Sequence, residues 1–343
     1  MKKTLKIAMA ATLLTVPAMA DSPYIAGGKL RNMENPLYLP TAGELYSKIG
    51  FGVMYKVTDN NDAQKKLFHG GEKEFPIWRP ALELGYGITD RWAVHGQLGY
   101  THNRDVERYG FHLGRIGTTY RIINSADGWV WDVYGDFHMG GVEQMKGSLV
   151  NKGAGFTFEY DNFSNGRWGY HVGTKVGKVW DRWTTSAFVE LLRTWGNHNN
   201  EIDVSKMGLG AYGVPSKMSV DLKSTTEYDL GANAFYQVND RWSFGIGLKY
   251  TYHAENGLEK LHTKLPSSVP TPVKNQINGL IEGYKEMNDE FSEFAQSLTV
   301  AYQATDRMQI AWFIENTIDD GQRLSASTTD FKAETAIRLN VKF

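Results

Sequence analysis

The chain contains no cysteine among its 343 residues. A disulfide framework and thiolate metal sites are therefore excluded. An excess of either charge is also missing, because 37 lysines and arginines stand against 38 aspartates and glutamates. Such a balance does not indicate binding to nucleic acid, which a strongly basic chain would suggest.

Long hydrophobic runs are absent after the N-terminus, and a membrane-spanning helix needs about 20 apolar residues. The one apolar stretch, residues 7–16, is shorter than that. It follows Lys2, Lys3 and Lys6 and precedes Ala18-Met19-Ala20, a small-x-small cleavage site. This order predicts a signal peptide over residues 1–20. The 37 basic residues less those three leave 34 against 38 acidic ones in the mature chain.

Enzyme motifs are missing as well. The chain has no His-Glu-x-x-His, no Gly-x-Ser-x-Gly and no phosphate loop, since Gly173-Thr-Lys-Val-Gly177-Lys178 has the wrong spacing. We therefore predict no enzymatic activity, no catalytic residues, no metal site and no cofactor.

The last thirteen residues, 331–343, show the pattern that organises the chain. Odd positions from Phe331 to Phe343 are apolar or neutral, whereas even positions such as Lys332, Glu334 and Arg338 are mostly charged or polar. Successive side chains of a strand point to opposite faces, so this strand has one apolar and one polar face. A soluble sandwich would show the same alternation.

An export signal, alternating strands and a final amphipathic strand ending on Phe343 resemble the outer-membrane β-barrel proteins of Gram-negative bacteria, of porin-like type. The resemblance covers nearly the whole mature chain. It implies a location in the outer membrane, with lipid around the barrel. It also implies that the barrel assembly machinery recognises the terminal strand with Phe343 as its assembly signal.

The predicted fold class is therefore all-β, a transmembrane antiparallel up-and-down barrel over residues 44–343. Three turns recur between alternating strands: Ile88-Thr-Asp-Arg-Trp92, Val238-Asn-Asp-Arg-Trp242 and Ala304-Thr-Asp-Arg-Met308. Asp and Asn favour such turns because their side chains bond the nearby backbone. If all three turns are periplasmic, residues 92–238 hold eight or six strands. We predict eight, including 152–161 and 204–213, which gives 14 strands; the alternative is 12.

Four tryptophans, Trp92, Trp129, Trp168 and Trp242, stand just after short turns. Because Trp and Tyr collect at membrane–water interfaces, we predict a periplasmic aromatic girdle at these positions. Residues 21–43 have no period and predict a coil, either periplasmic or in the lumen.

The longest loop, about 253–292, is predicted to contain one helix from Pro272 to about residue 292. Ile277, Leu280, Ile281, Tyr284, Met287 and Phe291 recur there at helical spacing. The stripe would pack on neighbouring loops, fold into the mouth as a lid, or dock on a partner protein.

Many charged residues share the polar phase of the strands. So many ionised groups would be prohibitive in a dry core, and they fit a water-filled interior. The predicted pore-lining residues are Lys48, Glu83, His95, Gln97, Arg115, Arg121, Asp132, Asp136, His138, Glu159, His171, Lys175, Asp229, Lys249, Glu315, Lys332, Glu334 and Arg338. Asp132, Asp136, His138 and Glu159 form a local cluster, which we interpret as a wetted wall with local pairing rather than a metal site.

These features predict a passive channel for small hydrophilic solutes. One alternative is a structural or adhesive barrel whose lumen is filled by the N-terminal coil or by the loop helix. Another is a barrel hydrolase of the outer membrane, which would need a histidine at the rim paired with a serine or an acid. Charge pairs bridging the lumen would favour a closed barrel, and separate charge ladders would favour a pore. Inner-phase aromatics such as Tyr46, Tyr134, Phe235 and Phe313 could stack sugars or fill space. The sequence does not fix the oligomeric state; we expect a monomer.

Overall fold

The structure is a computed structural model. It describes residues 32–57, 77–103, 108–140, 145–151, 156–161, 168–203, 209–222, 224–254, 258–261, 265–275, 278, 290–319 and 331–343. The predicted signal peptide lies outside the described residues, and the predicted N-terminal coil is described from Asn32 onward.

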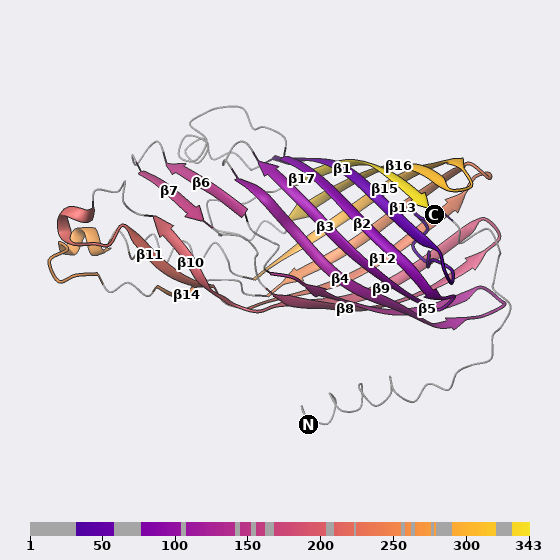
Figure 1. Cartoon of the computed structure of the whole chain (residues 1–343), viewed down its shortest axis with the longest axis horizontal. Coiled ribbons are helices and arrows are strands. Elements are labelled where there is room, and N and C mark those ends of the chain that lie inside the picture. Colours follow the sequence, from indigo (N-terminus) through magenta and orange to yellow (C-terminus); the bar gives the residue numbers. More distant parts are fainter. Residues whose placement is uncertain are drawn as a thin grey trace, which may run out of the picture.

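Twelve strands form a closed antiparallel ring (Figure 1). They are β1 (Leu45–Val57), β2 (Ile77–Thr89), β3 (Trp92–Asn103), β4 (Arg108–Asn124), β5 (Trp129–His138), β8 (Gly169–Trp180), β9 (Trp183–Thr194), β12 (Thr225–Gln237), β13 (Trp242–His253), β15 (Phe291–Thr305), β16 (Met308–Asp319) and β17 (Phe331–Lys342). Each pairs with the next in this order, and β17 pairs with β1, from Tyr46↔Lys342 to Val57↔Phe331. The predicted all-β antiparallel barrel is confirmed.

Apolar residues alternate with polar or small residues along the strands, so the closed sheet has an apolar outer face and a polar inner face. In β13, Trp242, Phe244, Ile246 and Leu248 are exposed, whereas the intervening Ser243, Gly245 and Gly247 are buried. The polar and small residues point inward, and the apolar ones point outward. An open sheet would leave unpaired edges, and closure of β17 on β1 removes them.

One end of the barrel is defined by tight turns, and we call it the short-turn end. Its turns lie at residues 90–91, 125–128, 181–182, 238–241 and 306–307, and the C-terminus lies there too (Figure 1). In the second of these turns Gly128 has φ 98°, a left-handed conformation that favours glycine. All three predicted Asp-Arg turns lie at this end, which is consistent with the parity argument that placed them on one side.

The opposite end, the long-loop end, carries five further strands beyond the ring: β6 (Met145–Asn151), β7 (Phe156–Asp161), β10 (Asn197–Asp203), β11 (Lys217–Leu222) and β14 (Leu258–Leu261). Figure 1 shows them, with the short 3₁₀ helix Leu209–Tyr212, extending away from the barrel. Among the described residues, β7 pairs with β6 and β10 and with no ring strand.

The prediction of 14 strands is wrong, and the alternative of 12 is confirmed. Within the predicted strand 152–161, residues 156–161 form β7 of the extension rather than a wall strand. The described part of 204–213 holds the 3₁₀ helix Leu209–Tyr212. Alternation of residue types does not separate the two cases, because a hairpin outside the membrane can carry the same pattern.

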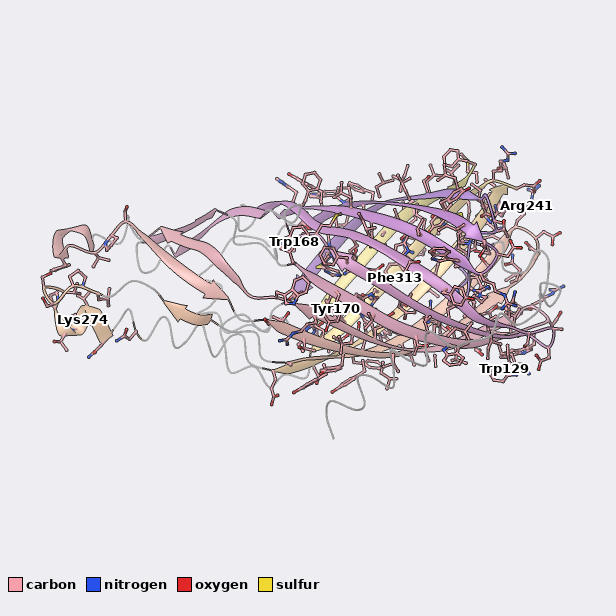
Figure 2. All side chains as sticks on the ribbon, turned by 60° about the horizontal axis from the view of Figure 1, so that its bottom comes forward. Trp129, Trp168, Tyr170, Arg241, Lys274 and Phe313 are labelled. Carbon is pink, nitrogen blue, oxygen red and sulfur yellow. The ribbon has the colours of Figure 1, made fainter. Side chains whose placement is uncertain are left out.

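The predicted loop helix is described only in part. Residues 271–275 form one helical turn at the tip of the extension, where Figure 2 labels Lys274. Most of the remaining predicted span up to residue 292 lies outside the described residues. Within the part of the chain that the structure describes, no helix is long and apolar enough to cross a membrane.

Aromatic side chains gather on the outer face at both ends of the barrel. Trp183 packs on Tyr236 and Trp242 on Tyr302 near the short turns, with ring centroids 4.7 and 4.8 Å apart. At the long-loop end Phe137 packs on Trp168, with centroids 5.4 Å apart. The barrel therefore carries two aromatic belts.

Three outward-facing tryptophans donate their indole N–H to a threonine hydroxyl on the neighbouring strand. The pairs are Trp92 with Thr118, Trp131 with Thr174, and Trp312 with Thr335, at 2.7, 2.7 and 2.8 Å. A polar group that faces lipid must find its partner within the protein. These pairs meet that requirement on the apolar face.

Candidate functional site

The inner face of the ring holds nearly all of the predicted pore-lining residues. The structure places the side chains of Lys48, Glu83, His95, Gln97, Arg115, Arg121, Asp132, Asp136, His138, His171, Lys175, Asp229, Lys249, Glu315, Glu334 and Arg338 in the inward phase of the ring strands. The side chain of Lys332 lies outside the described residues. The placement of Glu159 on the wall is wrong, since it lies on β7 in the extension.

The prediction for the four tryptophans needs one correction. Trp92, Trp129 and Trp242 open strands at the short-turn end, but Trp168 lies just before Gly169, which pairs with His138 at the far end of β5. Figure 2 shows Trp168 and Tyr170 at the long-loop end, opposite Trp129 and Arg241. The turn-like Asn165-Gly-Arg-Trp168 misled the prediction because its composition matches that of the short turns.

Residues 32–43, which we call the N-terminal plug, enter the lumen at the short-turn end. Asn32 donates to Ser243 Oγ at 2.8 Å and accepts from Gln309 Nε2 at 2.7 Å. Asn35 donates to Thr184 Oγ1 at 2.9 Å. The predicted coil thus occupies the lumen in its described part, and its amides bind β13, β16 and β9.

Charged wall residues hold the same segment. Arg338 Nη1 lies 3.0 Å from Glu34 Oε2, and Asn340 donates to Glu34 Oε1 at 2.8 Å. Arg121 donates to the carbonyl of Leu37 at 2.6 Å, and Lys175 donates to the carbonyl of Pro36 at 2.9 Å. Because β17 stands opposite β8 in the ring, the plug crosses the lumen from wall to wall.

A small apolar cluster anchors the middle of the plug. Leu37 is fully buried against Val130 and Val179. Val130 faces inward near the start of β5, and Val179 faces inward near the end of β8. Met33 and Leu39 are each 3 % exposed. Burial of an aliphatic side chain of this size contributes about 1.5–3 kcal/mol.

Glu44 fastens the plug where it joins β1. Tyr38 donates to its carboxylate at 2.6 Å, Thr41 donates at 3.0 Å, and Lys342 Nζ lies 3.2 Å away. Burial alone would raise the pKa of the Glu44 carboxyl, but the Tyr38 hydrogen bond and the Lys342 charge outweigh it and hold the pKa below its ordinary value of 4.5.

The members of the predicted acid–histidine cluster do not share one site. Asp132 binds Arg121, whereas Asp136 accepts from His95 Nε2 at 2.5 Å and from His171 Nδ1 at 2.8 Å. His138 is buried, and its Nε2 has no hydrogen-bond partner among the described residues. In the same described ranges, no group of three or more His, Asp and Glu is placed to hold a metal ion.

Wall ion pairs join strands that are neighbours or are separated by a single strand. Lys48 lies 3.8 Å from Glu83 on the next strand. Arg79 of β2 reaches Glu334 of β17 at 2.7 Å across Gly52 of β1. These pairs run along the wall and do not bridge the lumen.

Aromatic rings of the inner face lie flat over glycines of the next strand. A Cβ on Gly85 would fall 2.3 Å from the Tyr46 ring, one on Gly173 would fall 2.6 Å from Tyr134, and one on Gly231 would fall 2.2 Å from Phe188. These rings cover the wall instead of projecting across the lumen. Tyr46 and Tyr134 therefore fill space against the sheet and do not form a free stacking track.

A cavity of about 310 Å³ remains beside the plug. Its lining comes from β1, β2, β3, β16 and β17 and comprises Lys48, Gly50, Gly52, Arg79, Ala81, Glu83, Gln97, Phe313, Glu334, Ala336 and Arg338. Figure 2 shows Phe313 midway along the barrel. Six of these residues were not in the predicted pore-lining set, namely Arg79, Phe313 and the four small ones. Phe313 was predicted to face inward as an aromatic, and the inward phase of the other five could have identified them.

Sequence reasoning did not find the plug contacts. The wall residues that bind it, Thr184, Ser243, Gln309 and Asn340, are polar and nearly fully buried, in the inward phase near the short-turn end. Buried amides need partners. A run of buried polar residues at one end of several strands is the signal that could have indicated a luminal segment.

Comparison with solved structures identifies the fold. An outer membrane channel from Pseudomonas putida F1 aligns with a TM-score of 0.54 and 13 % identity, covering 95 % of this chain and 100 % of that one. The NanC porin aligns with a TM-score of 0.44 and 9 % identity, over 87 % and 100 % of the two chains. The Pseudomonas putida toluene transporter TodX aligns with a TM-score of 0.43 and 10 % identity, over 94 % of each.

No protein-family model and no curated protein sequence matches the chain. The likeness in structure shows that the chain has the closed antiparallel barrel fold of an outer-membrane channel protein.

Proposed function

We propose that the chain is an outer-membrane channel for small hydrophilic solutes, and that the N-terminal plug controls passage through its lumen. In this proposal the short-turn end faces the periplasm and the extension faces the exterior, as in other outer-membrane barrels. The channel acts without enzymatic chemistry.

The outer face supports the membrane location. On β13 the exposed side chains run from Trp242 to Tyr250, eight residues apart. At about 3.3 Å per residue and a strand tilt of about 40°, that span is about 20 Å high. The apolar band of an outer-membrane barrel is about 25 Å tall. On this outer face the Trp–Thr pairs satisfy the indole N–H groups of Trp92, Trp131 and Trp312.

The observation that carries the channel function is the arrangement of the inner face. In the part of the chain that the structure describes, the ion pairs between wall residues run along the wall, and the rings lie flat over glycines, so the wall itself leaves the lumen open. Among the described residues, the plug is the segment that crosses from one wall to the other. A barrel filled for stability would be expected to pair charges across the lumen from wall to wall.

The alternative of a structural barrel with a filled lumen has one specific observation in its favour. The plug makes hydrogen bonds or ion pairs to β4, β8, β9, β13, β16 and β17, which is a secure attachment. Under this alternative the plug stays in the lumen permanently.

Permeation into vesicles separates the two. The full chain and a chain without residues 21–43 would be reconstituted, and swelling would be followed in sugars of increasing size. We expect the full chain to admit small sugars slowly, and the shortened chain to admit them rapidly and to exclude large ones. A full chain that stays impermeable while the shortened chain is permeable would favour the filled barrel. Vesicles that stay impermeable with both proteins would contradict the channel proposal.

We also propose that Phe343 acts as the assembly signal. Its side chain is 65 % exposed on the outer face, and its N–H donates to the carbonyl of Leu45 at 2.9 Å. The ring is therefore available to the assembly machinery until lipid surrounds it.

A further inference from the structure

The cavity beside the plug shares one residue with the attachment of the plug. Arg338 lines the cavity and also holds the Glu34 carboxylate at 3.0 Å. Its guanidinium lies over the Phe313 ring, 4.5 Å from the centroid. Stacking on an aromatic face fixes the plane of a guanidinium and leaves its N–H groups free to bind at the edge.

Glu34 behaves as a carboxylate ligand supplied by the chain itself. Its side chain is only 5 % exposed, and its two oxygens are taken by Arg338 and Asn340. A buried carboxylate depends on such partners, because an unpaired buried charge costs several kcal/mol. The wall at this point is therefore already built to receive a carboxylate.

The cavity itself carries more positive than negative groups. Lys48, Arg79 and Arg338 line it together with Glu83 and Glu334. Arg79 pairs with Glu334 at 2.7 Å and Lys48 lies 3.8 Å from Glu83, so a solute carboxylate at Arg79 would share the guanidinium with Glu334. Gly50 and Gly52 of β1 lie between the two arginines, since Gly52 pairs with Arg79 and Gly50 with Arg338. A Cβ on Gly50 would meet only Arg338 Cγ at 3.7 Å and the Ala81 carbonyl at 3.9 Å, so the wall is open beside Arg338. Over Gly52 the Glu334 carboxylate takes the space, 3.0 Å from where a Cβ would lie.

We propose that this cavity binds a small carboxylate solute at Arg338 and Arg79, and that the solute competes with Glu34 for Arg338 and so loosens the plug. The inference rests on the proposed channel function and names its solute class and its control. Arginine binds carboxylates through paired N–H groups, which favours a carboxylate over a neutral solute. The volume lies at the lower end of ligand pockets, about 300–1,000 Å³, which suits a small molecule.

Accessibility of the plug tests the competition directly. The chain has no cysteine, so Met33→Cys would place a single thiol on the plug at a site 3 % exposed. The full-length protein, reconstituted in vesicles, would be treated with a membrane-impermeant thiol reagent. Benzoate is the carboxylate probe, and benzamide at the same concentration is its neutral counterpart.

We expect benzoate to accelerate thiol labelling of the Met33→Cys variant at least tenfold. Benzamide should leave the labelling rate unchanged. Equal rates with both compounds, or no acceleration by benzoate, would overturn the proposal. Leu39→Cys, also 3 % exposed, provides a second reporter if the first variant folds poorly.

Removing the plug carboxylate should make labelling easier, and removing a cavity arginine should make it depend on more benzoate. In the reporter background, Glu34→Gln should label rapidly without benzoate, because the neutral amide binds Arg338 more weakly. Arg79→Gln should require about tenfold more benzoate for the same rate. Lys249→Gln removes an inner-face cation that does not line the cavity, and we expect it to respond to benzoate as the parent does. Slow labelling of the Glu34 variant, or an unchanged response in the Arg79 variant, would contradict the proposal.

The channel proposal and the carboxylate site can fail independently, and the two experiments distinguish these failures. If benzoate loosens the plug but no solute crosses the membrane, the carboxylate site stands and the channel proposal falls. If solutes cross but benzoate has no effect, the channel stands and the carboxylate site falls.

Discussion

Arg121 and Asp132 form a two-point ion pair on the inner face of the barrel. Arg121 Nε lies 2.7 Å from Oδ1 and Nη2 lies 2.9 Å from Oδ2, and the side chains are 0 % and 5 % exposed. The same guanidinium donates to the carbonyl of Leu37. This pair therefore connects the wall formed by β4 and β5 to the N-terminal plug.

Asp132→Asn should destabilise the barrel strongly, because it leaves the buried guanidinium without its counter-charge. Loss of one partner of a buried ion pair costs about 3–5 kcal/mol. The free energy of unfolding in lipid vesicles, measured by urea titration with tryptophan fluorescence, would show this. Asp229→Asn is the matched control, since Asp229 faces a half-exposed Lys249 at 3.9 Å and such pairs contribute about 1 kcal/mol or less. Equal losses in the two variants would contradict this account of Arg121.

Thr174→Val should destabilise the barrel by about 1 kcal/mol, because it leaves the Trp131 indole N–H without a partner on the lipid-facing side. Trp131→Phe combined with Thr174→Val should cost less than the two single changes added together, since no N–H then remains to satisfy. The same urea titration measures all three variants. Additive losses would show that the hydrogen bond contributes nothing.

Gly173→Ala should force the Tyr134 ring off the wall, because the new Cβ would lie 2.6 Å from Cε2. Overpacking of this kind costs about 1–3 kcal/mol. The displaced ring would enter the lumen, so the open-state conductance should also fall. Gly96→Ala meets only the Arg115 carbonyl oxygen, at 3.7 Å, and should change neither property. A Gly173 variant with unaltered stability and conductance would refute the flat-ring arrangement.

The Glu44 contacts should weaken in acid. Because the folded-state pKa of Glu44 is held below 4.5, the ionised carboxylate stabilises the folded state above pH 4.5. This contribution is lost as the pH falls below 4.5 and through the lower folded-state pKa. Wild type should thus be more stable than Glu44→Gln at pH 7, and the difference should shrink towards zero in acid. A difference that is constant with pH would exclude this role.

Much of the barrel could be predicted from residues such as those of β13 and β17. Their period-two alternation follows from strand geometry, and the inward phase of Glu83, Asp132 or Arg338 follows from it directly. Short turns rich in Asp could be predicted for the same local reason.

Features that depend on distant contacts could not be predicted. Nothing local in residues 156–161 distinguishes β7 in the extension from a wall strand, because that choice is made by pairing with β6 and β10. Nor does Trp168 itself show at which end it lies. Residues 32–43 have no period, and their place in the lumen is fixed by partners such as Gln309 and Thr184, far away in sequence.

The most direct test of the central claim is single-channel conductance with the plug locked in place. The double substitution Asn35→Cys and Thr184→Cys introduces two cysteines whose parent side chains touch at 2.9 Å, in a chain with no other cysteine. In planar bilayers we expect no steady conductance from the oxidised protein, conductance after reduction, and a larger steady conductance from a chain that lacks residues 21–43. Equal conductance before and after reduction would show that the plug does not control the lumen, and silence from all three would show that the barrel is not a channel.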